Sequence, residues 1–182
     1  MIQLRLRSEC DGALAPFVTR IAEGEPRCAE DATLSSEEAG VLGFRTSQAE
    51  FWLRDVGPTD IAGDVLLIEP RRQIAHRLIR AASPHNTFLI TEQCDQLCLM
   101  CSQPPKPQHQ DMFAHFLAAA RLAPPGAQIG LSGGEPLLHK EALFAFIDAV
   151  FATRDDLSFH ILTNGQHFEH ADLPWLRKHR AG

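Results

Sequence analysis

Residues 140–165, KEALFAFIDAVFATRDDLSFHILTNG, contain a helix pattern that leads directly into a strand pattern. The first part has apolar side chains at the i, i+3, i+4, i+7 and i+8 positions that share one face of an α-helix. The second part alternates apolar and other residues, as a strand does. A helix with one such face lies on a sheet, so this stretch predicts an α/β fold. The apolar positions are Leu143, Phe146, Ile147, Val150 and Phe151 in the helix and Leu157, Phe159 and Ile161 in the strand.

The same order of elements extends in both directions from this stretch. An apolar run at 87–90, TFLI, precedes a helix pattern at 111–123, DMFAHFLAAARLA, and a further strand at 128–134, QIGLSGG. On the other side, Asp172 is suited to cap another helix with Pro174 in its first turn. Strands that alternate with helices predict parallel strands joined by right-handed crossovers.

Residues 1–80 have a different pattern. Short apolar runs separated by Gly, Pro and Asp predict a small, mainly β N-terminal domain. Residues 71–80, RRQIAHRLIR, fit either a short helix or an extended linker, because Ile74, Leu78 and Ile79 have helical spacing. We therefore expect two domains, at 1–80 and 81–182.

The composition is that of a folded chain without a strong charge signal. Of 182 residues, 45% are hydrophobic and 22% charged, which is enough to bury a core. A net charge of -6 without a block of Lys or Arg gives no reason to expect nucleic acid or an anionic membrane as a partner. The start of the chain lacks the apolar core of a secretion signal, and no later run reaches the roughly 18 apolar residues of a membrane span. We therefore expect a cytoplasmic protein, in which clustered cysteines bind metal or do redox chemistry rather than form disulfides.

Three of the five cysteines lie close together in the stretch TEQCDQLCLMCSQPP. Cys94, Cys98 and Cys101 have three and then two residues between them, so their thiolates can surround one inorganic centre. Such a set leaves one coordination position without a protein ligand. A [4Fe-4S] cluster with one open iron fits this arrangement.

Other interpretations of the cysteines were weighed. Structural zinc needs four ligands, and His85 and His109, the extra candidates nearby, have no characteristic spacing. The thiols could also pack as small apolar side chains. Cys10 and Cys28 are separated by 17 residues and form no recognised ligand set, so we expect them to be ordinary residues of the N-terminal region.

Two further segments follow strands and carry residues suited to ligand binding. Gly133 and Gly134 allow the backbone to approach a ligand closely, and the carboxylate of Glu135 can accept hydrogen bonds from an ammonium group. An ordinary Gly-rich turn is the alternative. Thr163 and Asn164, which precede a glycine, are explained equally well by turn chemistry. Because all three segments follow consecutive parallel strands, we expect them side by side at the carboxyl ends of the sheet.

The spacing Cys94-x-x-x-Cys98-x-x-Cys101 after a strand resembles the signature of the radical S-adenosylmethionine superfamily, and the resemblance covers residues 87 to about 178. It implies that the three cysteines bind a [4Fe-4S] cluster, that S-adenosylmethionine chelates the open iron, and that a 5'-deoxyadenosyl radical results. The Gly-Gly-Glu-Pro stretch resembles the element that binds the amino group of the cofactor, which assigns this role to Gly133, Gly134 and Glu135.

The remaining implied cofactor contacts and the fold also come from this resemblance. Thr163 and Asn164 are similar to the polar strand end that lies near the cofactor in this superfamily. Met100 stands where many members have an aromatic residue, and its thioether could pack on the adenine. The implied fold class is α/β, with the first half of a partial (β/α) barrel of parallel strands, about three βα units at 81–182, preceded by the small β domain.

A closer resemblance is carried by LITEQCDQLCLMCSQPPK together with the preceding DVLLIEP and the β-rich region. These are similar to the radical maturases of His-Xaa-Ser systems, of the type called HxsC. The resemblance implies a ribosomally made peptide as substrate, a second radical maturase as a possible partner, and an external electron donor.

Rival hypotheses follow from the same residues. The chain could be a catalytically inactive iron-sulfur or peptide-docking module, or a small electron-transfer protein in which Glu135 has no cofactor role. His139 and His160 are conceivable proton donors, but a helix-start residue and a strand side chain are the simpler interpretation. We also expect the last parallel strand, without a neighbour at its edge, to favour association.

Overall fold

The computed structural model describes residues 3–101 and 104–179. The chain divides into two compact units, the first formed by residues up to 84 with 118–124 and the second by 85–117 with the residues from 125 onward. The expected domains at 1–80 and 81–182 remain a prediction. Within the described residues, no helix is long and apolar enough to cross a membrane.

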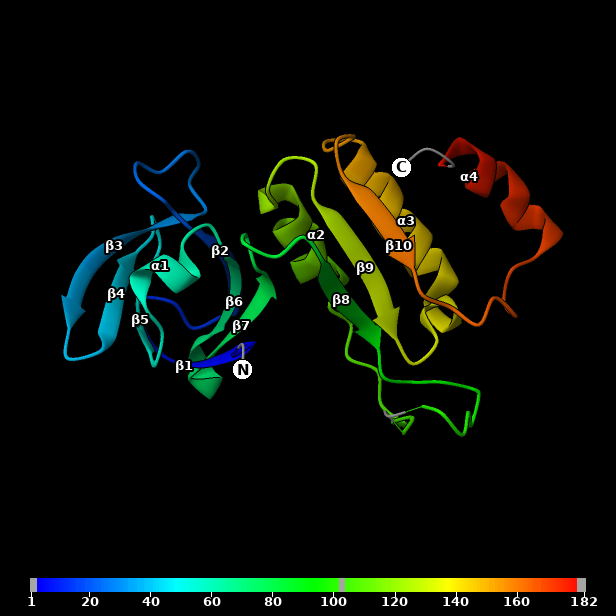
Figure 1. The fold of residues 1–182 in the computed structure, drawn as a ribbon, viewed down its shortest axis with the longest axis horizontal. Coiled ribbons are helices and arrows are strands. Elements are labelled where there is room, and N and C mark those ends of the chain that lie inside the picture. Colours follow the sequence, from blue (N-terminus) through cyan, green and yellow to red (C-terminus); the bar gives the residue numbers. More distant parts are fainter. Residues whose placement is uncertain (1–2, 102–103, 180–182) are drawn as a thin grey trace. The chain divides into compact units, whose positions relative to one another are not determined.

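The first unit is built around a closed barrel of seven strands in the order β1-β5-β4-β3-β2-β6-β7 (Figure 1). Neighbouring strands pair antiparallel except for β2 and β3, which are parallel. The strands are β1 (Arg5–Asp11), β2 (Phe17–Ile21), β3 (Asp31–Glu38), β4 (Val41–Arg45), β5 (Glu50–Arg54), β6 (Val65–Glu69) and β7 (Ile74–Ile79), with a short helix α1 (Pro58–Ile61) and a 3-10 turn η1 (Pro70–Arg72).

Alternating side chains fill the barrel. In β7, for example, Ala75, Arg77 and Ile79 point inward and are buried, while their neighbours are partly exposed. Phe44 and Phe51 stack in the barrel core with ring centroids 5.4 Å apart. The apolar core is made by Leu6, Ile21, Ala32, Leu42, Phe44, Phe51, Leu53, Ile61, Leu66, Ile68 and Ala75.

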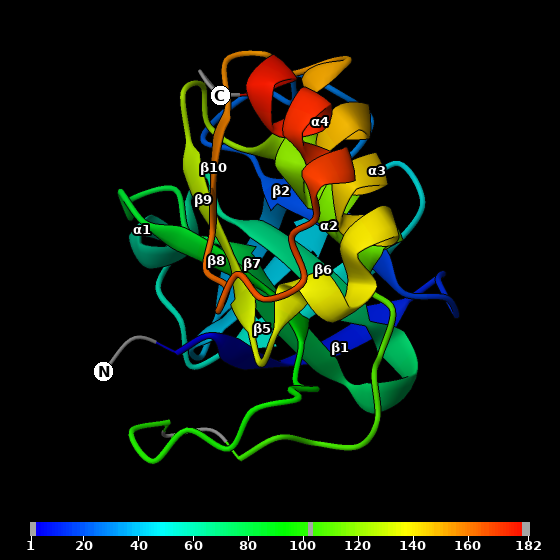
Figure 2. The same ribbon diagram turned by 90° about the vertical axis from the view of Figure 1, so that its right-hand side faces the viewer.

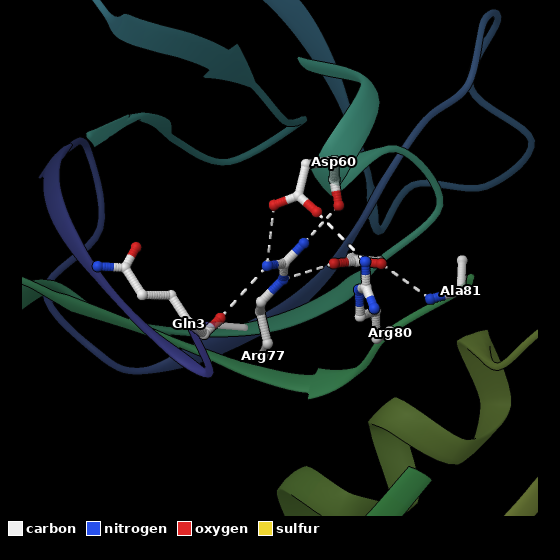
Figure 3. Close-up of polar contacts among 6 residues, drawn as sticks. Gln3, Asp60, Arg77, Arg80 and Ala81 are labelled. Carbon is white, nitrogen blue, oxygen red and sulfur yellow. Dashed lines mark hydrogen bonds and ion pairs between the residues drawn. The ribbon is translucent and has the colours of Figure 1, made fainter. Parts of the chain in front are cut away.

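One buried arginine joins three parts of the barrel unit (Figure 3). Arg77 Nε donates to Asp64 at 2.7 Å, and the side chains of both residues are about fully buried. Its Nη groups donate to the Asp60 side chain and main chain and to the carbonyl of Gln3. Asp64 also accepts from the N–H of Ala81 at 2.8 Å. Burial raises the pKa of Asp64, so the neighbouring guanidinium is needed to keep that carboxyl ionised.

The second unit contains a three-stranded parallel sheet in the order β10-β9-β8. Phe88 of β8 lies opposite Leu131 of β9, which lies opposite Ile161 of β10. Figure 2 shows helix α3 along one face of this sheet. The elements from residue 85 onward are β8 (Asn86–Thr91), α2 (Phe113–Leu122), β9 (Gln128–Gly133), η2 (Pro136–His139), α3 (Lys140–Phe151), β10 (Ser158–Ile161), η3 (His170–Asp172) and α4 (Leu173–Lys178). Helix α2 is counted with this unit only up to residue 117.

Aromatic contacts hold the helices on this face. Phe88 stacks on Phe116 of α2, with ring centroids 4.6 Å apart, and Phe146 of α3 packs edge-on against both Phe88 and Phe159. The predicted apolar stripe of α3 is confirmed at Leu143, Phe146, Ile147 and Val150, which are buried, whereas Phe151 is half-buried. The opposite face of the sheet leaves Leu89 and His160 exposed.

The predicted fold class is wrong. Most strands belong to the closed barrel of mixed strands, and the parallel strands form only a three-stranded sheet with few helices, not the first half of a partial barrel of parallel strands. Helical and strand periodicity correctly located the local elements from 86 onward. It could not show that the apolar runs before residue 80 close into a barrel of their own, because that depends on pairing between distant strands.

Two local predictions in the barrel unit also need correction. Residues 71–80 are neither a helix nor a linker, because most of them form β7, which pairs with β1 and β6. Strand β3 was not anticipated, since only its first two residues are buried and the rest of DATLSSEE is largely exposed.

The carboxyl ends of the parallel strands lie on the same side of the second unit. In Figure 1 the arrowheads of β8, β9 and β10 point the same way, and the long connection from β8 to α2 begins there. This connection contains the three clustered cysteines. We call residues 92–101 the cysteine loop.

Candidate functional site

Gly133, the last residue of β9, and Gly134 bring the end of this strand against the start of the cysteine loop. Gly134 N–H donates to the carbonyl of Thr91 and Glu135 N–H to that of Gln93, both at 2.8 Å. Gly133 has φ of 143°, and a Cβ there would overlap the Thr91 carbonyl. A Cβ on Gly134 would overlap the Gln93 carbonyl and lie 3.0 Å from Cys94 Cβ. Only glycines permit this close approach.

Glu135 is nearly fully buried and joins the ends of β9 and β10. One carboxylate oxygen accepts from Leu137 N–H at 2.9 Å and from the Thr163 hydroxyl at 2.6 Å. The other accepts from Asn164 N–H at 2.8 Å. Among the residues that the structure describes, this is the one hydrogen bond to that second oxygen, which leaves one of its two lone pairs. The carboxylate therefore has a structural function that the sequence did not predict, while its role toward a ligand stays a prediction.

The segment after β10 is an ordered turn. The Thr163 hydroxyl accepts from Gly165 N–H at 2.9 Å, and the Asn164 side chain accepts from Gln166 N–H at 2.9 Å. Gly165 has a positive φ of 76°. Thr163 and Asn164 thus have the turn roles that were the alternative interpretation, and they also contact Glu135.

The three clustered thiols differ in their surroundings. Cys94 is half-buried beside the glycine turn, whereas Cys98 and Cys101 are exposed on a turn in which Cys101 N–H donates to the Cys98 carbonyl at 3.1 Å. Met100 lies between them, also fully exposed. In the part of the chain that the structure describes, no three or more His, Cys, Asp or Glu side chains are grouped so that they could hold a metal ion.

The donor set fits an iron-sulfur cluster in the identity of its ligands and in its place after β8, but not in the arrangement of the thiols. Three thiols are carried by one loop at the carboxyl end of β8, next to a glycine turn that exposes no competing side chain. Three thiolates without a fourth protein ligand suit a [4Fe-4S] cluster with one open iron. The thiols are thus available for such a cluster but are not arranged around a common point.

The base of the cysteine loop is closed by contacts with the returning chain. Lys106 N–H donates to the Glu92 carbonyl at 2.9 Å, and the two side chains form an ion pair. The Gln93 amide donates to the Pro107 carbonyl at 2.8 Å. The start of the loop is therefore fixed although its outer turn is exposed.

Two histidines adjoin this base, a cluster that the sequence did not reveal. The rings of His109 and His139 stack with centroids 3.7 Å apart, and His139 Nε2 lies 3.1 Å from Gln93 Oε1. Because the Gln93 amide nitrogen faces a carbonyl, its oxygen faces His139, so His139 Nε2 carries the proton. Burial, reinforced by the charge of His109, lowers the pKa of His139. His160, by contrast, is an exposed strand residue whose Nε2 lies 3.0 Å from Gln128.

The segment after β10 reaches the cysteine loop through side chains that were also missed. His167 Nε2 lies 2.9 Å from Asp95 Oδ2, and the Gln96 amide donates to Gln166 Oε1 at 3.1 Å. The hydrogen bond from His167 lowers the pKa of Asp95. Lys140 of α3 donates to the His167 carbonyl at 3.1 Å. The pairs Asp95–His167 and Gln96–Gln166 join residues 72 and 70 positions apart, so no local pattern could have shown them.

A groove of about 270 Å³ lies between the end of β8 and the chain that leads into α2. It is lined by Leu89, Ile90, Thr91, Glu92, Lys106, Gln108, His109, Gln110 and Met112.

Cys10 and Cys28 belong to the barrel unit and are free, half-buried thiols. Burial raises the pKa of both. Their interpretation as ordinary residues stays a prediction.

The comparisons with known proteins add no family. No protein-family model, no curated protein and no solved structure matches this chain. The functional argument therefore depends on the residues and contacts described above.

Proposed function

We propose that the chain is a radical S-adenosylmethionine enzyme of the cytoplasm that acts on a ribosomally made peptide. Cys94, Cys98 and Cys101 would hold the [4Fe-4S] cluster. One observation supports this most. The loop with three thiols and the Gly-Gly-Glu turn follow adjacent parallel strands, and two main-chain hydrogen bonds, from Gly134 and Glu135, join them.

Each residue has a defined part in this proposal. The main chain at Gly133 and Gly134 packs against the main chain of Thr91 and Gln93 next to Cys94, and the methionyl end of the cofactor would bind beside this turn. Glu135 holds this turn against the end of β10 and has one acceptor direction left for an ammonium group. Thr163 and Asn164 keep the carboxylate oriented, and the exposed Met100 is free to contact the adenine.

The bound cluster and S-adenosylmethionine would supply reductive cleavage to a 5'-deoxyadenosyl radical, with the electron coming from an external donor. The chain's own contribution is to hold three thiolates and to orient the methionyl group. The peptide substrate and a second radical maturase are the proposed partners.

Anaerobic reconstitution tests this function. Wild-type protein should bind about four irons through its three thiolates and form 5'-deoxyadenosine under reductant, whereas Cys94→Ala, Cys98→Ala and Cys101→Ala should not. Cys28→Ala, which alters a thiol in the other unit, is the matched control. A colourless protein that binds one zinc would contradict the proposal.

A second candidate is a catalytically inactive iron-sulfur or peptide-docking module. It is favoured by the three internal hydrogen bonds of Glu135, which leave little of its carboxylate for a ligand. Calorimetry on the reconstituted protein separates the two, because an inactive module would hold iron without binding S-adenosylmethionine.

A further inference from the structure

We infer that Gln166 and His167 are positioning residues that hold the first part of the cysteine loop and thereby orient Cys94. The role of Cys94 as a cluster ligand rests on the proposed function. The contact itself does not, because it is made between side chains of this chain.

The two contacts are made by the residues that follow Cys94 in the sequence, whereas the glycine turn contacts residues that precede it. Thr91 and Gln93 accept main-chain hydrogen bonds from the turn after β9. Asp95 and Gln96 instead contact His167 and Gln166 through their side chains. Cys94 thus lies between a residue fixed by the β9 turn and a residue fixed by the segment after β10.

The segment that carries Gln166 and His167 is itself firmly held. At its start, the Thr163 hydroxyl and Asn164 N–H donate to the buried Glu135. Further on, Lys140 Nζ, which is mostly buried, donates to the His167 carbonyl and to Asp172, each at 3.1 Å. The side chain of His167 therefore extends from a fixed main chain, and its contact with Asp95 can restrain the cysteine loop.

The outer turn of the loop gives little help in orienting the thiols. Leu97, Leu99 and Met100 are almost completely exposed. Restraint on the loop must therefore come largely from its first residues, which makes the contacts at Asp95 and Gln96 the places to test.

Amide hydrogen exchange of residues 94–101 in the cofactor-free protein tests the restraint. His167→Ala should speed exchange there by about fivefold, the effect of losing one hydrogen bond. His167→Gln, whose amide nitrogen can take the place of Nε2, should restore slow exchange. The double variant Asp95→Ala/His167→Ala should show no faster amide exchange than either single variant. His160→Ala, which alters an exposed histidine on β10 itself, is the matched control and should leave the exchange rates of residues 94–101 unchanged.

The electron paramagnetic resonance spectrum of the reconstituted, reduced protein tests the orientation of Cys94. His167→Ala should retain iron but give a broadened signal, and His167→Gln should return it to the wild-type shape. The inference would be overturned if His167→Ala left the amide exchange rates of residues 94–101 unchanged, or if His160→Ala changed them as much as His167→Ala does. If wild-type protein takes up no cluster, the proposed function fails, while the exchange experiment still decides whether His167 restrains the loop.

Discussion

Glu135 N–H donates to the carbonyl of Gln93 at 2.8 Å, and this bond sets the glutamate of the glycine turn beside the residue that precedes Cys94. The bond needs Gly134, because a Cβ there would overlap the same carbonyl. The close approach of the two loops is therefore specified by the sequence at one glycine.

Gly134→Ala should lower the free energy of unfolding by about 1–3 kcal/mol, the usual cost of inserting a methyl group where no space exists. Urea unfolding of the cofactor-free protein measures this. Gly57→Ala is the control, since Gly57 has an ordinary φ of -87° and open space around its Cα. Equal stability of the two variants would show that the approach at Gly134 is not tight.

Glu135→Ala should destabilise the protein by about 2–4 kcal/mol, because several buried donors lose a charged acceptor. Glu135→Gln keeps the shape of the side chain and should destabilise the protein less than Glu135→Ala. Thermal unfolding of the cofactor-free variants measures this structural role independently of any ligand. A fully stable Glu135→Ala variant would mean that the carboxylate does not hold β9 and β10 together.

Stability should depend on pH through His139. Its pKa in the folded protein is lowered below the ordinary 6.5, so the unfolded chain takes up a proton first as pH falls. The contribution of neutral His139 is complete above pH 6.5 and is lost as pH falls from there toward the folded-state pKa. His109 and Asp111 act on it in opposite directions, His109 lowering the pKa and Asp111 raising it.

Urea titrations at a series of pH values, with His139→Gln beside wild type, check this dependence. The difference in unfolding free energy between wild type and His139→Gln should change as pH falls below 6.5 and should be constant above pH 6.5. A difference that grows above pH 7 would have the wrong sign.

Arg77→Met should destabilise the barrel unit by about 3–5 kcal/mol, because Asp64 would remain buried without its partner. Arg54→Ala, which removes the exposed pair with Glu9, should cost about 0–1 kcal/mol. Differential scanning calorimetry compares them. Similar small effects in both would show that the Arg77 network is not a fixed part of the barrel.

Local periodicity predicted the second unit well at the level of elements. The stripe of α3 is visible in the sequence because Leu143, Phe146, Ile147 and Val150 repeat at helical spacing and are all buried. In β7 the same reasoning failed, because the buried positions include Arg77 and the partly exposed positions include Ile74 and Leu78. An inward-pointing arginine breaks the apolar alternation that identifies a strand.

The candidate site was predicted at the level of its three segments, because consecutive parallel strands place the cysteine loop, the glycine turn and the segment after β10 at one edge of the sheet, where hydrogen bonds join them. The cysteines and the two glycines stand out by composition and spacing. The pairs Gln93–His139 and Asp95–His167 join residues 46 and 72 positions apart, and such contacts follow from the pairing of strands rather than from any local pattern.

The most direct test of the central claim is the electron paramagnetic resonance spectrum of the reconstituted, reduced protein with and without S-adenosylmethionine. We predict a [4Fe-4S] signal that is lost in Cys94→Ala, Cys98→Ala and Cys101→Ala and that changes shape when S-adenosylmethionine binds the open iron. A signal that is indifferent to S-adenosylmethionine, or its persistence in the cysteine variants, would contradict the claim.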